Sequence, residues 1–245
     1  MNKIKNFARW LLFPGIDLHT RNRASLCRFW GIGNRYVLDA GSGNGYFSWL
    51  AYKSGATVVA INREDEQVEK AKGFFINYLG LDSERLTFEN RNLNDLELEK
   101  RTFDENICYE VLEHIKNDTF ICQQFFRLLR PGGTLHLCCP NKVHPRHQAE
   151  KLDLEETGGH YRAGYSEEDY NKLLLPIGFN IDAVIGLGPN SLFFADEILR
   201  TLRARLGDII ALPLFPLFYP FAKFAKFNPT MPFSLYVKAT KPSHK

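Results

Sequence analysis

The sequence predicts an α/β fold built on a mostly parallel sheet, and two observations lead to this prediction. First, short apolar or β-branched runs alternate with helical patterns from residue 35 to residue 187, and such alternation favours parallel strands joined by right-handed crossovers. Second, the 245 residues are 44% hydrophobic and 24% charged, which suits a globular chain with a well-buried core. We therefore expect one domain over residues 1–245.

Seven segments have the composition of strands, and helical patterns connect most of them. The expected strands are 35–40, 56–61, 85–89, 106–108, 134–139, 179–185 and 233–239. The expected helices are 44–53, 64–79, 119–129 and 167–175. The turn residues at 130–133 (RPGG) are expected to stop the third helix. Ser166 is expected to cap the fourth, with Asp169 in place of the usual Glu of a capping box.

Two segments lie outside this alternation. Residues 1–30 are expected to form helices before the first strand, and their apolar run is too short and too charged for a signal peptide. Residues 188–232 interrupt the sheet before the last strand. Within them, 192–206 has an amphipathic helical pattern. The apolar stretch 209–222 contains three prolines, at 213, 216 and 220, which are expected to forbid a continuous helix and leave a bent flap.

The cysteines indicate the redox environment. There are five, and no two of them form a C-x-x-C pair: Cys27, Cys108, Cys122, Cys138 and Cys139. Most lie in apolar runs, so we expect buried thiols in a reducing compartment, not disulfides or a zinc site. The expected location is the cytoplasm.

A glycine-rich turn carries the sharpest functional pattern. A strand ends at Asp39 and is followed by glycines at every second position, Gly41, Gly43 and Gly45, before a helix begins. Glycine permits a tight turn and a close approach of a ligand to the main chain. A dinucleotide fingerprint needs its third glycine at position 46, which is Tyr46, and no P-loop lysine follows.

In this glycine-rich turn, the chain resembles the class I S-adenosylmethionine-dependent methyltransferases. Two further stretches are similar to motifs of that family in the same order, 103–114 (FDENICYEVLEH) and 128–133 (LLRPGG). The resemblance implies a Rossmann-like methyltransferase fold, with a mostly parallel seven-stranded sheet and helices on both faces. It divides the chain into N-terminal helices (1–30), a cofactor-binding core (31–187), a substrate lid (188–232) and a last strand (233–240).

The resemblance also implies which residues bind S-adenosylmethionine, leaving S-adenosylhomocysteine as product. They are Asp39, Gly41, Ser42, Gly43, Asn62, Arg63, Asn92, Leu93 and Tyr109. Two of them depart from the family, which usually has an acid where this chain has Asn62 and Asn92. Asparagine still forms hydrogen bonds but loses the stronger charge-assisted kind. A non-catalytic cofactor-binding scaffold therefore stays open.

Three segments, 18–23, 110–114 and 159–166, are similar to the ubiquinone-pathway O-methyltransferases. They favour O-methylation of a hydrophobic or aromatic small molecule, with N- or C-methylation of a specialised metabolite as the alternative. His114 and His160 are the candidate bases by residue type. His144 and His147 lie in a proline-flanked polar loop and are expected to be solvated. The pattern Glu110-x-x-Glu113-His114 is implied to hold a divalent cation in some relatives, including small-RNA 3′-end methyltransferases, with His160 as a possible fourth ligand. Because the same pattern is common where no metal binds, we expect none here.

The expected partners follow from the aromatic and basic residues. Tyr161 and Tyr165 either line an aromatic substrate or pack on the following helix. Phe215 and Phe218 are expected to line the acceptor pocket as part of the lid.

Both ends of the chain are basic around an acidic centre, although the net charge is only +3. This suits a peripheral contact with a membrane surface or simple solvated helices. A homodimer is possible, and no nucleic-acid partner is expected.

Overall fold

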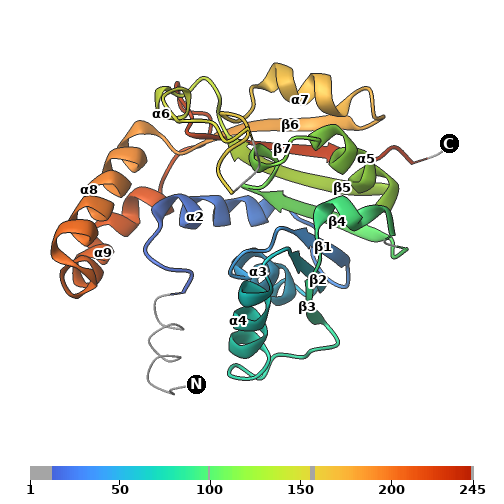
Figure 1. The fold of residues 1–245 in the computed structure, drawn as a ribbon, viewed down its shortest axis with the longest axis horizontal. Coiled ribbons are helices and arrows are strands. Elements are labelled where there is room, and N and C mark those ends of the chain that lie inside the picture. The colour runs from blue at the N-terminus through green and yellow to red at the C-terminus, as the bar shows by residue number, and fades with distance from the viewer. Residues whose placement is uncertain (1–12, 99, 155–157, 244–245) are drawn as a thin grey trace. The chain divides into compact units, whose positions relative to one another are not determined.

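A computed structural model describes residues 13–98, 100–154 and 158–243, so the first twelve residues of the predicted N-terminal helical segment 1–30 lie outside the described residues. Within them, seven strands form one sheet in the order β3-β2-β1-β4-β5-β7-β6 (Figure 1). The strands are β1 (Tyr36–Ala40), β2 (Thr57–Asn62), β3 (Leu86–Asn90), β4 (Phe103–Tyr109), β5 (Leu129–Pro140), β6 (Asn180–Leu187) and β7 (Ser234–Thr240). All seven predicted strands are present, and the Rossmann-like fold is confirmed.

The strand order places a change of direction beside β1. Strand β1 pairs in parallel with β2 on one side and with β4 on the other, and Asp39 lies opposite Ala60 and Ile107. The chain moves outward through β2 and β3 and then returns to the other side of β1 for β4. In open α/β sheets, ligands bind outside the carboxyl ends of the strands at such a point.

The helices between these strands are close to those predicted. They are α3 (Tyr46–Lys53), α4 (Asp65–Phe75), α5 (Asp118–Leu128) and α7 (Glu167–Leu174). Two short 3-10 helices, η2 (Leu93–Leu98) and η3 (Leu112–His114), and the short α-helix α6 (Pro145–Gln148) lie between them. The predicted capping box is confirmed, because Ser166 accepts from the Asp169 N–H and Asp169 accepts from the Ser166 N–H. Two boundaries were wrong: α4 ends four residues early, and β5 begins at Leu129, so that this strand includes the expected turn at 130–133.

The main core forms where β1, β4 and β5 meet α5 and α7. Its largest buried side chains are aromatic, among them Phe103, Phe125 and Tyr170. Four cysteines are buried and Cys27 is half-buried, all as free thiols, as the sequence predicts. Burial raises the pKa of the Cys27 thiol to about 12, so this group stays protonated at neutral pH.

The chain divides into two compact units. We call Phe29–Val184 with Leu235–Lys245 the sheet unit, and Met1–Arg28 with Ile185–Ser234 the helical unit. The helical unit contains α2 (Leu18–Arg23), α8 (Asn190–Leu206) and α9 (Asp208–Lys223). These three helices pack around a small apolar core of their own, made of Ile16, Leu18, Leu192, Ala195, Leu199, Ala211 and Ala222. The predicted 188–232 segment lies within this unit.

The expectation that prolines break the apolar stretch was wrong, because α9 runs continuously through Pro213, Pro216 and Pro220. The physical reason is their spacing. At intervals of three and four residues they fall on one side of the helix, and all three are exposed. The three proline rings therefore face solvent, while the opposite apolar side packs on the unit's core. None of the described helices has the length and apolar character needed to cross a membrane.

Candidate active site

The glycine turn after β1 is hydrogen-bonded to the end of β2. The backbone N–H groups of Gly41 and Ser42 both donate to the Ile61 carbonyl, at 3.0 and 2.9 Å. Gly41 has φ +82°, and a Cβ there would lie 2.4 Å from a methyl carbon of Val111. Any side chain at this position would be strained and would collide with its neighbour. At Gly43 a Cβ would meet nothing within 4 Å, so this part of the main chain is open to a ligand.

Asp39 is buried at the base of the turn. Its carboxylate accepts a hydrogen bond from the Ser48 hydroxyl on α3, and the residue is only 3% exposed. Burial raises the pKa of this carboxyl to about 6, in spite of the Ser48 hydrogen bond. A cation bound nearby would offset the cost of keeping Asp39 charged.

A pocket of about 500 Å³ opens beside this turn, at the carboxyl edge of the sheet. Six predicted site residues line it: Gly41, Asn62, Arg63, Asn92, Leu93 and His114. The sequence analysis missed other lining residues, among them Glu64, Gln67, Arg91, Val111 and Ile115. They follow the ends of β2, β3 and β4, so the strand-end rule for parallel sheets identifies them in principle. Asp39, Ser42, Gly43 and Tyr109 do not line this pocket.

The two asparagines that replace the usual acids both stabilise turns. The Asn62 side chain accepts from the Glu64 N–H at 2.9 Å, and the Asn92 side chain accepts from the Asn94 N–H at 3.0 Å. Each side-chain carbonyl therefore supports its own loop, and each amide group remains as a hydrogen-bond donor. Among the described lining residues that follow β2, Glu64 supplies the carboxylate.

A second group of polar residues gathers around η3. Glu113 is fully buried, and a ligand atom from each of Glu113, His114 and His160 lies within 4.8 Å of the other two. The His114 and His160 rings meet edge to face at 4.6 Å. His114 Nδ1 lies 2.8 Å from the Gly159 carbonyl. Because a carbonyl only accepts, Nδ1 must carry the proton, and Nε2 is left to accept one. Burial also lowers the pKa of His114.

The remaining candidate aromatic residues lie in three different places. Tyr109 is buried at the end of β4, where its hydroxyl accepts from the Trp30 indole at 3.0 Å. Tyr161 is half-buried, and its backbone N–H donates to the Glu113 carbonyl. Tyr165 is buried and stacks on Tyr170 of α7 at 5.0 Å, which corresponds to the alternative in which it packs on the following helix. Phe215 and Phe218 lie on α9 and pack on the core of the helical unit.

Two histidines expected in a solvated loop are instead buried. His144 and His147 are each 5% exposed. His144 caps α6 by accepting from the Arg146 N–H, and Pro145 occupies the first turn. The polar, proline-flanked sequence was therefore a helix start, which the loop interpretation missed.

The fold and the pocket together define a class of protein. A family model described as a methyltransferase domain matches residues 33–172, more than half of the chain. The chain therefore belongs to this family, the class I S-adenosylmethionine-dependent methyltransferases, and its cofactor is S-adenosylmethionine.

Individual relatives agree with this assignment. A ubiquinone biosynthesis O-methyltransferase of Haemophilus ducreyi is 34% identical over 114 residues, covering 46% of this chain and 48% of that protein. One from Xanthomonas oryzae pv. oryzae is 36% identical over 109 residues, 44% of each. The chain thus spans about half the length of the curated relatives it matches.

Solved structures show the same fold at low identity. An S-adenosylmethionine-dependent methyltransferase from Mesorhizobium loti has a TM-score of 0.62 at 18% identity, covering 92% of this chain and 100% of that one. Phosphoethanolamine N-methyltransferase 2 of Haemonchus contortus, in complex with S-adenosyl-L-methionine, has a TM-score of 0.62 at 20% identity, covering 99% of this chain and 58% of that one.

Proposed function

We propose that the protein transfers the methyl group of S-adenosylmethionine to a hydroxyl group of a hydrophobic or aromatic small molecule. One observation carries the proposal. His114 lines the same pocket as Gly41 of the glycine turn and contacts His160, so we take His114 as the proton acceptor for a substrate hydroxyl. The similarity to two ubiquinone biosynthesis O-methyltransferases supports hydroxyl as the acceptor group.

The chemistry asks the protein mainly to position two reactants. Methyl transfer is an in-line displacement at a sulfonium, whose leaving group is neutral, so alignment of the acceptor contributes much of the rate. A hydroxyl acceptor also has to lose its proton. His114 is oriented for this role, since the Gly159 carbonyl holds Nδ1 as the donor and leaves Nε2 as the base. His160 contacts the His114 ring and itself lies 3.0 Å from a Glu150 carboxylate oxygen.

The same group of side chains offers a second way to activate the hydroxyl. One carboxylate and two imidazoles within 4.8 Å have the donor types that bind divalent transition metals. A cation held by Glu113, His114 and His160 would lower the pKa of a bound hydroxyl. In that case His114 would serve as a ligand and not as the base, so dependence on added metal separates the two mechanisms.

Several finer expectations belong to this proposal. We propose that the acceptor is a small molecule and not a nucleic acid. The buried thiols favour a cytoplasmic location for the protein. A homodimer is compatible with the family. Tyr161 is the aromatic side chain nearest in sequence to His160 and is our candidate for a substrate contact. N- or C-methylation needs no base at His114 and is the alternative reaction.

The test uses methyl-labelled S-adenosylmethionine with a panel of phenols, catechols and amines. We expect labelled ethers, and we expect His114→Ala and His160→Ala to lower turnover by about 10²-fold, with cofactor affinity by calorimetry unchanged. Asp39→Ala is the matched contrast, since it should weaken cofactor binding itself. The metal arm repeats the assay after chelation, with Mg²⁺ or Mn²⁺ restored.

Each remaining outcome points to a different conclusion. Cofactor binding without any labelled product would contradict the proposal and favour a cofactor-binding scaffold. Labelled amines, with turnover insensitive to both histidine changes, would favour N-methylation.

A further inference from the structure

Helix α9 of the helical unit is apolar on two neighbouring sides. Its inner side packs on the unit's core through Ala211, Phe215, Phe218 and Ala222. Its outer side carries a second series at the same helical spacing, which we call the outer stripe: Ile210, Leu214, Leu217, Phe221 and Phe224. Between Asp208 and Lys223 the helix has no charged residue. An ordinary amphipathic surface helix has only one apolar side.

The outer stripe is exposed over most of its length. Leu217 is 69% exposed, Phe221 45% and Phe224 73%. The nearby Tyr219 is 37% exposed, and Phe194 on α8 is 61% exposed. Single exposed apolar residues need no explanation, but a contiguous series of large ones marks a contact surface.

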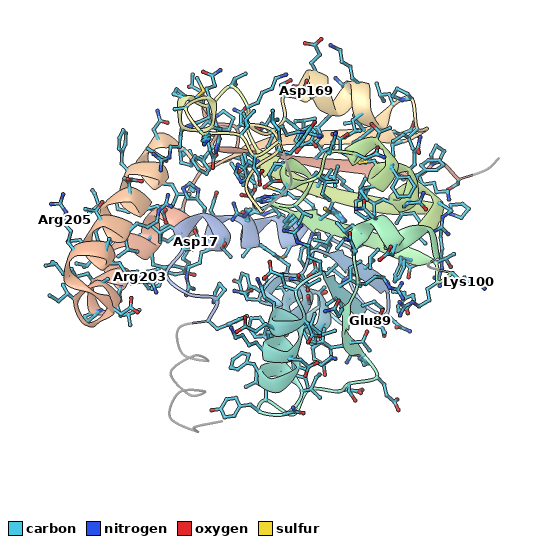
Figure 2. The ribbon with its side chains drawn as sticks, in the orientation of Figure 1. Asp17, Glu89, Lys100, Asp169, Arg203 and Arg205 are labelled. Carbon is cyan, nitrogen blue, oxygen red and sulfur yellow. The ribbon has the colours of Figure 1, made fainter. Side chains whose placement is uncertain are left out.

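Cationic side chains border this surface. The acids of the region are already paired, because Arg203 lies 2.6 Å from Asp208 and Arg200 lies 2.8 Å from Asp196. Arg205, Lys223 and Lys226 have no acidic partner among the described residues and are all exposed. Figure 2 shows Arg205 extending outward from the last turn of α8. The surface therefore combines an apolar stripe with an excess of positive charge.

A groove of about 720 Å³ adjoins the carboxyl end of the stripe. It is lined by Phe221, Phe224 and Phe227, with Lys226 as its one cation among the described lining residues. Proline side chains, including Pro220 and Pro229, complete much of the rest. A groove with apolar walls and a single ammonium group suits an amphiphile with a negative head group.

We infer that the outer stripe and this groove form a docking surface for an anionic lipid bilayer. The 16 residues of α9 rise about 24 Å. With its inner side packed on protein, the helix would lie in the interface plane, with the stripe among the acyl chains and the cations at the head groups. A symmetric dimer through the same surface would instead bring two sets of unpaired cations together. The inference does not depend on the acceptor proposed above.

The test is co-sedimentation of the full chain with phosphatidylcholine vesicles, with and without phosphatidylglycerol. We expect binding to the anionic vesicles that weakens as salt is raised. Lys223→Glu/Lys226→Glu should weaken it by about thirtyfold or more, since each cation near the surface contributes about fivefold. Leu217→Ser/Phe221→Ser should weaken it by about tenfold or more through lost apolar burial.

Matched controls separate this surface from general charge and hydrophobicity. Lys100→Glu/Lys151→Glu makes the same change in net charge at two exposed lysines of the sheet unit, and Ile32→Ser/Leu154→Ser removes two exposed apolar side chains there. Both should bind vesicles as the unchanged chain does. Circular dichroism and cofactor calorimetry check that every variant is folded.

Three outcomes would overturn the inference. The first is absence of binding to anionic vesicles at low salt. The second is an equal loss of binding in the controls. The third is a dimer, found by analytical ultracentrifugation, that Leu217→Ser/Phe221→Ser dissociates while no variant or unchanged chain binds vesicles.

Discussion

At the scale of single residues, local sequence determines the conformation of the glycine turn, whereas the surroundings determine the pKa of Asp39. Glycines at alternate positions allow φ values that other residues avoid, so the turn is legible from the sequence alone. The pKa of Asp39 cannot be predicted from the sequence alone, because it depends on burial by side chains distant in the chain. Burial raises that pKa to about 6, which places the titration of this carboxyl within an accessible range.

This pKa gives a pH prediction for cofactor binding. The α-amino group of S-adenosylmethionine stays cationic below about pH 7, and a cation beside Asp39 favours its charged form. Below about pH 6 the cofactor must displace a proton, so affinity should fall by up to about tenfold per pH unit. In Asp39→Asn the pH dependence should flatten, and affinity near neutral pH should drop by about 1–3 kcal/mol. Calorimetry from about pH 5 to 7.5 measures both effects.

An unaltered pH dependence in Asp39→Asn would assign the proton to another group in the pocket. His114 is the next candidate, because it lines the pocket beside the glycine turn and burial lowers its pKa. His114→Asn, which keeps a side-chain donor without a titrating ring, serves as the control.

At the scale of elements, local patterns predicted the helix starts better than the helix ends. The capping box at α7 is entirely local, with Ser166 and Asp169 each accepting from the other's backbone N–H. The end of α4 is different, since Phe75 and Phe88 stack at 5.6 Å and the chain turns towards β3. The apolar pattern that predicts a helix as far as Leu79 gives no information about that tertiary contact.

The capping box gives a stability prediction. Ser166→Ala leaves one donor of the first turn of α7 without its side-chain acceptor, so the free energy of unfolding should fall by about 1 kcal/mol. Ser166→Thr keeps the acceptor and should retain most of the stability. Urea denaturation followed by circular dichroism measures both. Equal transition midpoints for Ser166→Ala and the unchanged chain would mean that water satisfies this donor at no cost.

At the scale of the whole molecule, a buried histidine couples folding to pH. His136 on β5 is fully buried, with Nδ1 2.7 Å from the Tyr236 hydroxyl on β7. Burial, together with the positive charges of Lys238 and Arg35, lowers the pKa of His136 to about 3, although a Glu105 carboxylate oxygen lies 3.8 Å from Nε2. The folded chain therefore holds this ring neutral at pH values where the unfolded chain protonates it.

The sign of the effect follows from this difference. Because the folded pKa lies below the unfolded value of about 6.5, stability should fall as pH decreases from about 6.5 towards 3, by up to about 1.4 kcal/mol per pH unit. Asp39 acts in the opposite direction, since its raised pKa gives stability that is lost as pH rises through about 6. Denaturation of the unchanged chain and of His136→Gln isolates the histidine, because Asp39 is common to both.

We expect the unfolding free energy of the unchanged chain, minus that of His136→Gln, to decrease steadily below pH 6.5, whatever its value at neutral pH. A constant difference across that range would show that His136 takes up a proton in the folded state, in contradiction to its burial.

The sequence by itself determined the fold class, the glycine turn, the capping box and the family, because each rests on local periodicity, on backbone conformation or on a motif of adjacent residues. Only the tertiary structure decided which strand-end residues share a pocket, why Asn62 and Asn92 support turns, and that η3 brings Glu113 and His114 to His160. It also decided that α9 continues through three prolines. These features depend on burial and on contacts between residues far apart in the chain, and no local pattern records which segments the folded chain brings together.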